Sequence, residues 1–78
     1  MAKPIEACHV AVGSRIRMVR ETLGITQEEL AARLPKGVTR TSLANIELGR
    51  QRLLLDRVED FARALGTTPK HLMKGVWW

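Results

Sequence analysis

Residues 26–49 read TQEELAARLPKGVTRTSLANIELG and contain two short helix signals separated by a proline and a glycine. Thr26 is followed three positions later by a glutamate, a capping box in which the two side chains satisfy free backbone N–H groups. The helix that begins there ends before Pro35, because the residue before a proline is pushed out of the α region. Thr39 caps a second helix, which Gly49 ends as a left-handed C′ residue. The stretch predicts two helices joined by a tight turn.

Apolar residues at helical spacing precede this stretch and predict a first helix. It begins as early as Pro4, whose fixed φ suits a first turn, and it stops at Gly24. Gly13 and Ser14 interrupt the pattern, so the start is poorly marked. The expected apolar face consists of Val12, Ile16, Val19 and Leu23.

Two further helices are predicted after the stretch. The fourth helix ends at Gly66 and has the densest apolar face of the chain, formed by Leu55, Val58, Phe61, Ala62 and Leu65. Thr68 and Pro69 form an N-cap and first-turn pair that opens a short fifth helix. The fold class expected is all-α, a compact five-helix bundle in a single domain over residues 1–78.

Composition narrows the classes of function. The chain has 78 residues and a net charge of +5, from 13 Lys and Arg against 8 Asp and Glu, a balance that favours phosphates as partners. No apolar run exceeds four residues, so no membrane segment is expected, and we expect a cytoplasmic, nucleoid-associated protein.

The sequence offers little for metal binding or catalysis. Cys8 is the single cysteine, and Cys8 and His9 lack the further ligands of a zinc site because His71 lies near the far end. The sequence provides no catalytic Cys/His pair, no paired carboxylates in an apolar setting and no Gly-rich phosphate loop. We expect neither a metal nor a cofactor, and we do not expect an enzyme.

The helix that starts after Thr39 presents side chains suited to reading bases. Two short helices with a tight connection let one helix cross the DNA backbone while the next enters the major groove, which admits one helix. Arg40 can bond bidentately to guanine and Asn45 to adenine, and Thr41 can touch a thymine methyl group or a base edge. These three residues are the predicted base readers, although exposed polar residues on small helices often serve only solubility.

The chain resembles the Cro/repressor-type (XRE-like, lambda-repressor-like) helix-turn-helix transcriptional regulators of phages and bacteria. The resemblance covers residues 12–72 and rests on three motifs. They are RIRMVRETLGITQEELA (residues 15–31), SLANIELGR (residues 42–50) and ALGTTP (residues 64–69). The resemblance implies a regulator that binds a pseudo-palindromic operator on double-stranded DNA as a homodimer, and that represses transcription.

Several residue roles follow from this resemblance alone. Gln27 is expected to contact the phosphate backbone and to brace the recognition helix, and Arg50 and Arg52 are expected to touch phosphates. Arg20 and Glu47 are expected to form a structural ion pair between the first helix and the end of the recognition helix. Such a pair holds orientation more than it adds stability.

The chain departs from the family pattern at two places. The turn from Pro35 to Val38 is two residues longer than usual, so Lys36 is free to reach a phosphate and the angle between the two helices is in doubt. Leu53 and Leu54 stand where the family has a proline and a small polar cap, which leaves the start of the fourth helix weakly marked. Four other arginines are expected on solvated faces: Arg15, Arg17, Arg57 and Arg63.

The last residues are the predicted dimerisation region, about residues 67–78. The family commonly dimerises through the fifth helix, so the proposed interface consists of Leu72, Met73, Trp77 and Trp78. The alternative is that one tryptophan folds back over the first helix. A second possible function is an antitoxin or other protein-interaction module that uses the same fold to bind a toxin or another protein partner.

Overall fold

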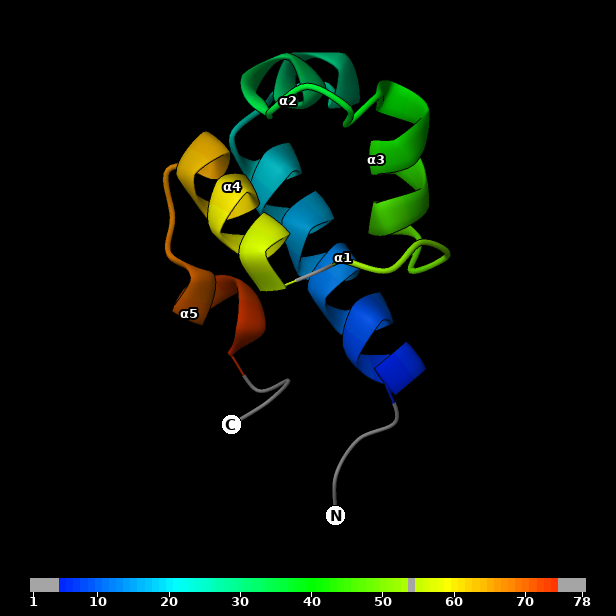
Figure 1. The fold of residues 1–78 in the computed structure, drawn as a ribbon. Coiled ribbons are helices and arrows are strands. Elements are labelled where there is room, and N and C mark those ends of the chain that lie inside the picture. Colours follow the sequence, from blue (N-terminus) through cyan, green and yellow to red (C-terminus); the bar gives the residue numbers. More distant parts are fainter. Residues whose placement is uncertain (1–4, 54, 75–78) are drawn as a thin grey trace.

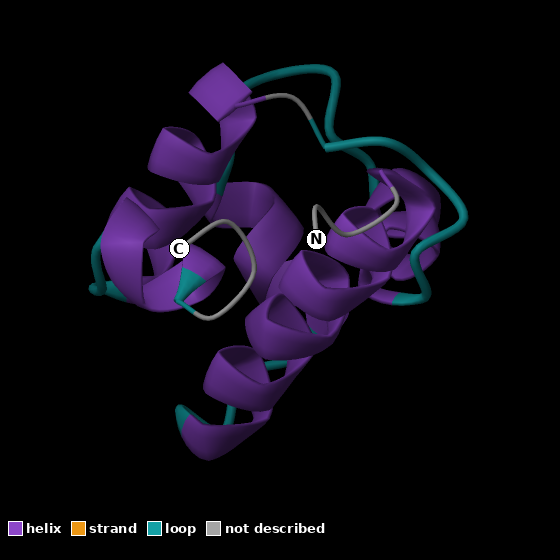
Figure 2. Cartoon of the chain, turned by 90° about the horizontal axis from the view of Figure 1, so that it is seen from below, coloured by secondary structure: helices purple, strands orange, loops and turns teal. Residues whose placement is uncertain are grey.

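The structure is a computed structural model that describes residues 5–53 and 55–74. Figure 2 shows helices and loops and no strand in these residues. The helices are α1 (Ile5–Thr22), α2 (Gln27–Arg33), α3 (Arg40–Glu47), α4 (Leu55–Leu65) and α5 (Pro69–Met73). The predicted all-α class with five helices is therefore confirmed.

Local capping bonds start three of the helices where the sequence predicts. The Thr26 hydroxyl accepts a hydrogen bond from the Glu29 N–H at 3.1 Å, and the Glu29 carboxylate accepts one from the Thr26 N–H at 3.0 Å. Thr39 caps α3 and Thr68 caps α5 through the same kind of side-chain bond, with Pro69 in the first turn of α5. These bonds satisfy N–H groups that have no partner inside a helix.

The long helix α1 lies at the centre of the molecule (Figure 1) and packs against α3, α4 and α5. The helix α2 packs against α3 and α4, and α4 packs against α5. All five helices contribute to one apolar core, whose largest fully buried side chains are Phe61, Ile16, Leu30, Leu43, Leu72, Val12 and Val58. This core fixes the inner face of α3 and leaves its outer face to solvent.

Gly13 allows α1 and α3 to approach closely. The helix α1 continues through Gly13 and Ser14 without a break, so the interruption expected there does not occur. A Cβ atom at Gly13 would overlap the Ile46 carbonyl oxygen and lie 3.1 Å from the carbonyl carbon. Gly49, with φ of +75°, ends α3 beside Val10, whose Cα would lie 2.9 Å from an added Cβ. At Gly13 the backbone of α1 therefore meets the backbone of α3 without an intervening side chain.

Leu23 is an exception to the predicted apolar face of α1. It follows the last helical residue, Thr22, and its side chain is 48% exposed. The helix ends in a turn at this point, in which the Leu23, Gly24 and Ile25 N–H groups bond back to carbonyls of the last turn of α1. The spacing of apolar residues by three and four positions continues past the last helical residue. This spacing alone does not show where the helix ends.

Candidate nucleic-acid interface

The helix α2 lies near the C-terminal end of α1, α3 lies alongside α1, and residues 34–39 join α2 to α3 (Figure 1). Leu34 leaves the helical region with ψ of 159°, as expected for a residue before proline. Within the turn, the Val38 N–H donates a 3.4 Å hydrogen bond to the Pro35 carbonyl oxygen. Thr39 then starts α3, which packs against both α1 and α2.

The outer face of α3 carries the three predicted base readers. Arg40 and Thr41 are exposed and Asn45 is half-buried, whereas Leu43 and Ile46 are buried in the core. The first and second turns of α3 therefore project polar side chains away from the molecule. A helix bearing an arginine, a threonine and an asparagine on one accessible face suits contacts with base edges in a major groove.

Arg20 and Glu47 form a bidentate ion pair behind that face. The Arg20 Nε donates to Glu47 Oε2 at 2.7 Å and Nη2 donates to Oε1 at 3.1 Å, while Nη1 donates to the Ile25 carbonyl oxygen at 2.9 Å. The two side chains are only 11% and 2% exposed. Hydrogen bonding to Glu47 raises the pKa of Arg20 further above its ordinary value, against the opposing effect of burial. The pair joins α1 to the end of α3.

Gln27 extends this network to the start of α2. Its Nε2 donates to Glu47 Oε1 at 3.1 Å, so one carboxylate receives bonds from α1 and from α2. Gln27 also lies between two surface hollows: one of about 510 Å³ that it shares with Arg40, and one of about 210 Å³ that it shares with Ala44 and Leu48. The structure thus brings Gln27 beside the outer face of α3.

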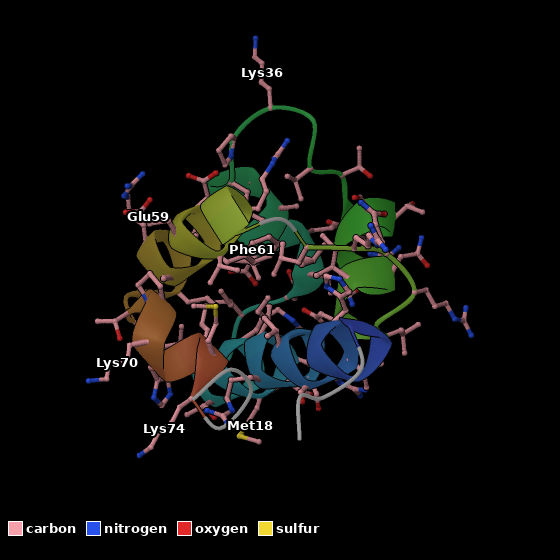
Figure 3. The ribbon with its side chains drawn as sticks, turned by 60° about the horizontal axis from the view of Figure 1, so that its bottom comes forward. Met18, Lys36, Glu59, Phe61, Lys70 and Lys74 are labelled. Atoms are coloured by element: carbon pink, nitrogen blue, oxygen red, sulfur yellow. The ribbon has the colours of Figure 1, made fainter. Side chains whose placement is uncertain are left out.

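The remaining predicted contacts lie on the two loops that flank α3. Lys36 is exposed at the tip of the turn and points away from the rest of the molecule (Figure 3). Arg50 and Arg52 are exposed in the loop after α3. The Arg50 N–H bonds to the Asn45 carbonyl oxygen at 2.9 Å, which ties this loop to the helix. The structure therefore places Lys36 apart from the outer face of α3, whereas Arg50 lies next to that face.

Comparison with known proteins identifies the family. Residues 11–73 match the family described as "Helix-turn-helix domain". The chain belongs to the helix-turn-helix family. A helix-turn-helix relative is an uncharacterized HTH-type transcriptional regulator of Methanothermobacter thermautotrophicus, 49% identical over 51 residues, which are 65% of this chain and 71% of that protein.

Solved helix-turn-helix structures share the fold. The restriction-modification controller protein C.AhdI from Aeromonas hydrophila has a TM-score of 0.79 and 30% identity, over 90% of this chain and 99% of that chain. The clp gene regulator ClgR from C. glutamicum has a TM-score of 0.77 and 26% identity, over 90% and 86% of the two chains. A hypothetical transcription factor from Neisseria, NHTF, has a TM-score of 0.76 and 27% identity, over 94% and 82%.

The family settles the broad class of this helix-turn-helix protein. The predicted resemblance to the Cro/repressor-type regulators is confirmed. The members of this family are DNA-binding transcription regulators, which are not enzymes. Within the described ranges, 5–53 and 55–74, no group of histidine, cysteine, aspartate and glutamate side chains is arranged to hold a metal ion. None of the described helices has the length and apolar character needed to cross a membrane.

The helix α5 of this helix-turn-helix chain serves its own core. Leu72 is fully buried and Met73 is 8% exposed, and the chain itself covers both side chains. This burial corrects the expectation that Leu72 and Met73 form the interface with a second copy, because the apolar face of a helix does not show whether its own chain or a partner covers it. The exposed residues from Thr68 to Lys74 are Thr68, Lys70, His71 and Lys74. Trp77 and Trp78 lie outside the described residues.

Sequence reasoning missed two residues on the face of α3. Ala44 and Leu48 stand three and seven positions after Thr41, so they share a helix face with Thr41 and Asn45. Leu48 is 52% exposed and Ala44 is half-buried. Apolar contacts to thymine methyl groups are part of base readout, so such residues belong to the candidate interface. Their spacing of three and seven positions from Thr41 could have indicated these two residues.

Sequence reasoning also missed the role of Arg15. Its Nη1 donates to the His71 carbonyl oxygen at 2.8 Å and its Nη2 to the Lys74 carbonyl oxygen at 3.4 Å. These bonds satisfy carbonyls at the end of α5 that have no helical partner. Arg15 thus joins α1 to α5, and no local pattern indicates a bond between residues 56 positions apart.

Proposed function

We propose that the chain binds a pseudo-palindromic operator on double-stranded DNA as a homodimer and represses transcription by occupying promoter DNA. The observation that carries the proposal is the outer face of α3, where Arg40, Thr41 and Asn45 are accessible while Glu47 anchors the same helix to Arg20 and Gln27. A rigidly held helix with hydrogen-bonding groups on its free face is what base readout requires. Such a protein acts at the nucleoid.

Each residue has a distinct role in this proposal. Arg40 reads guanine, Asn45 reads adenine and Thr41 contacts a thymine methyl group or a base edge, and these contacts specify sequence. Phosphate contacts position the protein without reading sequence, and four residues are proposed for them: Gln27, Lys36, Arg50 and Arg52. The net charge of +5 supports this electrostatic component.

The homodimer follows from the geometry of operators. Two copies related by a two-fold axis would place their recognition helices in major grooves about 34 Å apart, one helical turn of DNA. The related proteins named as a restriction-modification controller and a clp gene regulator support a role in transcription control. The proposed contact between copies involves the α5 region, with Trp77 and Trp78.

Enrichment of bound sequences from a random duplex library tests the proposal, at physiological salt so that non-specific phosphate binding is suppressed. The expected result is a two-fold symmetric consensus with half-sites one helical turn apart. A single half-site would contradict the dimer, and no enrichment would contradict operator binding and favour a protein-interaction module. The matched control for Arg40→Ala is Arg63→Ala, an exposed arginine on α4, which should enrich the same consensus as the native chain.

A further inference from the structure

A small hollow lies beneath the turn between α2 and α3, on the side facing α4. Its volume is about 160 Å³. The turn contributes Gly37 and Val38, and Figure 3 shows Phe61 of α4 on the body of the molecule below the turn that carries Lys36. The remaining walls are formed by α3, by the loop after it and by α4, through Ser42, Ile46, Gln51, Arg52, Leu53 and Arg57.

Arg57 lines this hollow and also carries an unsatisfied donor. Its Nη1 is buried and has no hydrogen-bond partner among the described residues. Buried polar groups in native proteins are almost always hydrogen-bonded, and an unpaired nitrogen on a charged group carries a larger penalty than a neutral one. Two of the exposed arginines, Arg17 and Arg63, have carboxylates nearby, at 3.5 Å and 3.8 Å. An acceptor from outside the chain would satisfy Arg57.

Other polar groups around the hollow also offer donors. Ser42 Oγ accepts a hydrogen bond from Gln51 Nε2 at 2.8 Å, which leaves the hydroxyl hydrogen of Ser42 to be donated. Arg52 adds a second positive charge to the wall. None of the described residues that line the hollow is acidic. The chemistry of the site is thus that of a binding site for a negatively charged oxygen group.

We propose that this hollow binds a single phosphate-type oxyanion, with Arg57 as the buried donor and Ser42 and Arg52 as its companions. The volume is well below the roughly 300–1,000 Å³ of sites for drug-sized ligands, so the hollow suits one small ion. Free inorganic phosphate and a phosphate of the DNA backbone offer the same chemistry. Because the turn and α3 both supply walls, an occupied site holds the long turn against the recognition helix.

The test is a titration of the full chain with inorganic phosphate, which replaces chloride at constant ionic strength, followed by ¹⁵N NMR and by thermal melting. The expected result is a saturable set of shifts at the amides of Val38, Ser42 and Leu53, with a rise in Tm. In Arg57→Gln the affinity should fall by about ten-fold or more, the loss of one charge-assisted hydrogen bond. Arg63→Gln removes the same charge from the same helix and should bind phosphate like the native chain.

Several outcomes would overturn the site. They are equal phosphate affinity in Arg57→Gln, the absence of saturation, and shifts spread over exposed lysines and arginines. Should Arg57→Gln fail to fold, the map of shifts in the native chain alone decides. Repeating the phosphate titration on the complex with duplex DNA identifies the source: persistent phosphate binding indicates a free ion, and lost binding indicates a backbone phosphate in the hollow. The phosphate titration of the free chain does not depend on operator binding, so either proposal can fail alone.

Discussion

The arginine and the asparagine on the outer face of α3 make the sharpest prediction at the scale of residues. Arg40→Ala and Asn45→Ala should each weaken binding to the selected operator by about 1–3 kcal/mol, about 5- to 150-fold, and relax preference at one base position. Quantitative binding to the operator and to its single-base variants measures both effects. Equal losses on all sequences would show that the residue touches only the backbone.

The Glu47 carboxylate gives a second prediction, because it accepts bonds from Arg20 and from Gln27. Glu47→Ala leaves the Arg20 guanidinium without its partner, and breaking a buried pair costs about 3–5 kcal/mol. We expect the lower end of this range, because Arg20 stays 11% exposed to water. Denaturant unfolding measures the change in the free energy of unfolding.

The control for Glu47→Ala is Glu21→Ala, which breaks the ion pair with Arg17. Both side chains of that pair are more than half exposed, at 57% and 55%. Its loss should change stability by less than about 1 kcal/mol. Similar effects of the two substitutions would mean that the Glu47 carboxylate does not anchor α3.

Single residues also show where sequence reasoning stops. The Arg20–Glu47 contact was indicated by a family motif, and polar residues such as Arg40 were indicated by their place on the helix. The bonds of Arg15 to α5 and the buried Nη1 of Arg57 were not indicated. Both arginines were expected on solvated faces, because the partner or cavity that changes their role comes from a distant part of the chain.

At the scale of elements, helix ends were the most predictable features and helix crossings the least. A cap such as Thr26 or Thr39 satisfies N–H groups two or three residues away, so the whole cause lies in a short stretch. The crossing of α1 and α3 at Gly13 depends on a carbonyl oxygen that lies more than thirty positions away in the chain. In the sequence Gly13 therefore indicated a break, whereas in the structure it marks a contact.

Gly13→Ala tests this crossing. The added Cβ would overlap the Ile46 carbonyl oxygen, so α1 and α3 must separate. Overpacking of this kind costs about 1–3 kcal/mol and sometimes more. The free energy of unfolding should fall, and operator affinity should fall with it because α3 is displaced. Ser14→Ala, an exposed neighbour in α1, is the control, and a Gly13→Ala protein as stable as this control would contradict the contact.

The capping box of α2 predicts a dependence of stability on pH. Hydrogen bonds from the Thr26 backbone N–H, and then from its side chain, lower the pKa of Glu29 below its ordinary value of 4.5. A carboxyl whose folded pKa is depressed stabilises the fold above its unfolded pKa, and that contribution disappears as the pH falls through the folded pKa. The native chain should therefore be more stable than Glu29→Gln at pH 7, and this difference in stability should vanish in acid.

Thermal melting of the native chain and of Glu29→Gln between pH 7 and acid measures this effect. Glu28→Gln removes a neighbouring exposed carboxylate that takes no part in the capping box. A difference that stays constant with pH, or one that Glu28→Gln reproduces in full, would remove the capping box as its cause.

At the scale of the whole molecule, the small size of the chain bears on assembly. A domain of about this length buries only about 60% of its unfolded surface, so its stability is modest and a second copy adds to it by mass action. Removal of residues 76–78, which include Trp77 and Trp78, should weaken self-association and make Tm less dependent on protein concentration. Sedimentation at several concentrations checks this expectation. An unaltered sedimentation profile would place the tryptophans outside the dimer contact and favour their packing on their own chain.

In the proposed function, the outer and inner faces of α3 carry separate tasks, and this separation has a consequence for how the protein changes over evolutionary time. In the described part of the chain, the side chains of Arg40, Thr41 and Asn45 form no internal hydrogen bond. The helix α3 is held by the hydrogen bonds of Glu47 and by the packing of buried Leu43 and Ile46. New residues at the three outer positions would alter the preferred operator and leave folding intact. A duplicated gene could thus acquire a new regulatory target through a few substitutions.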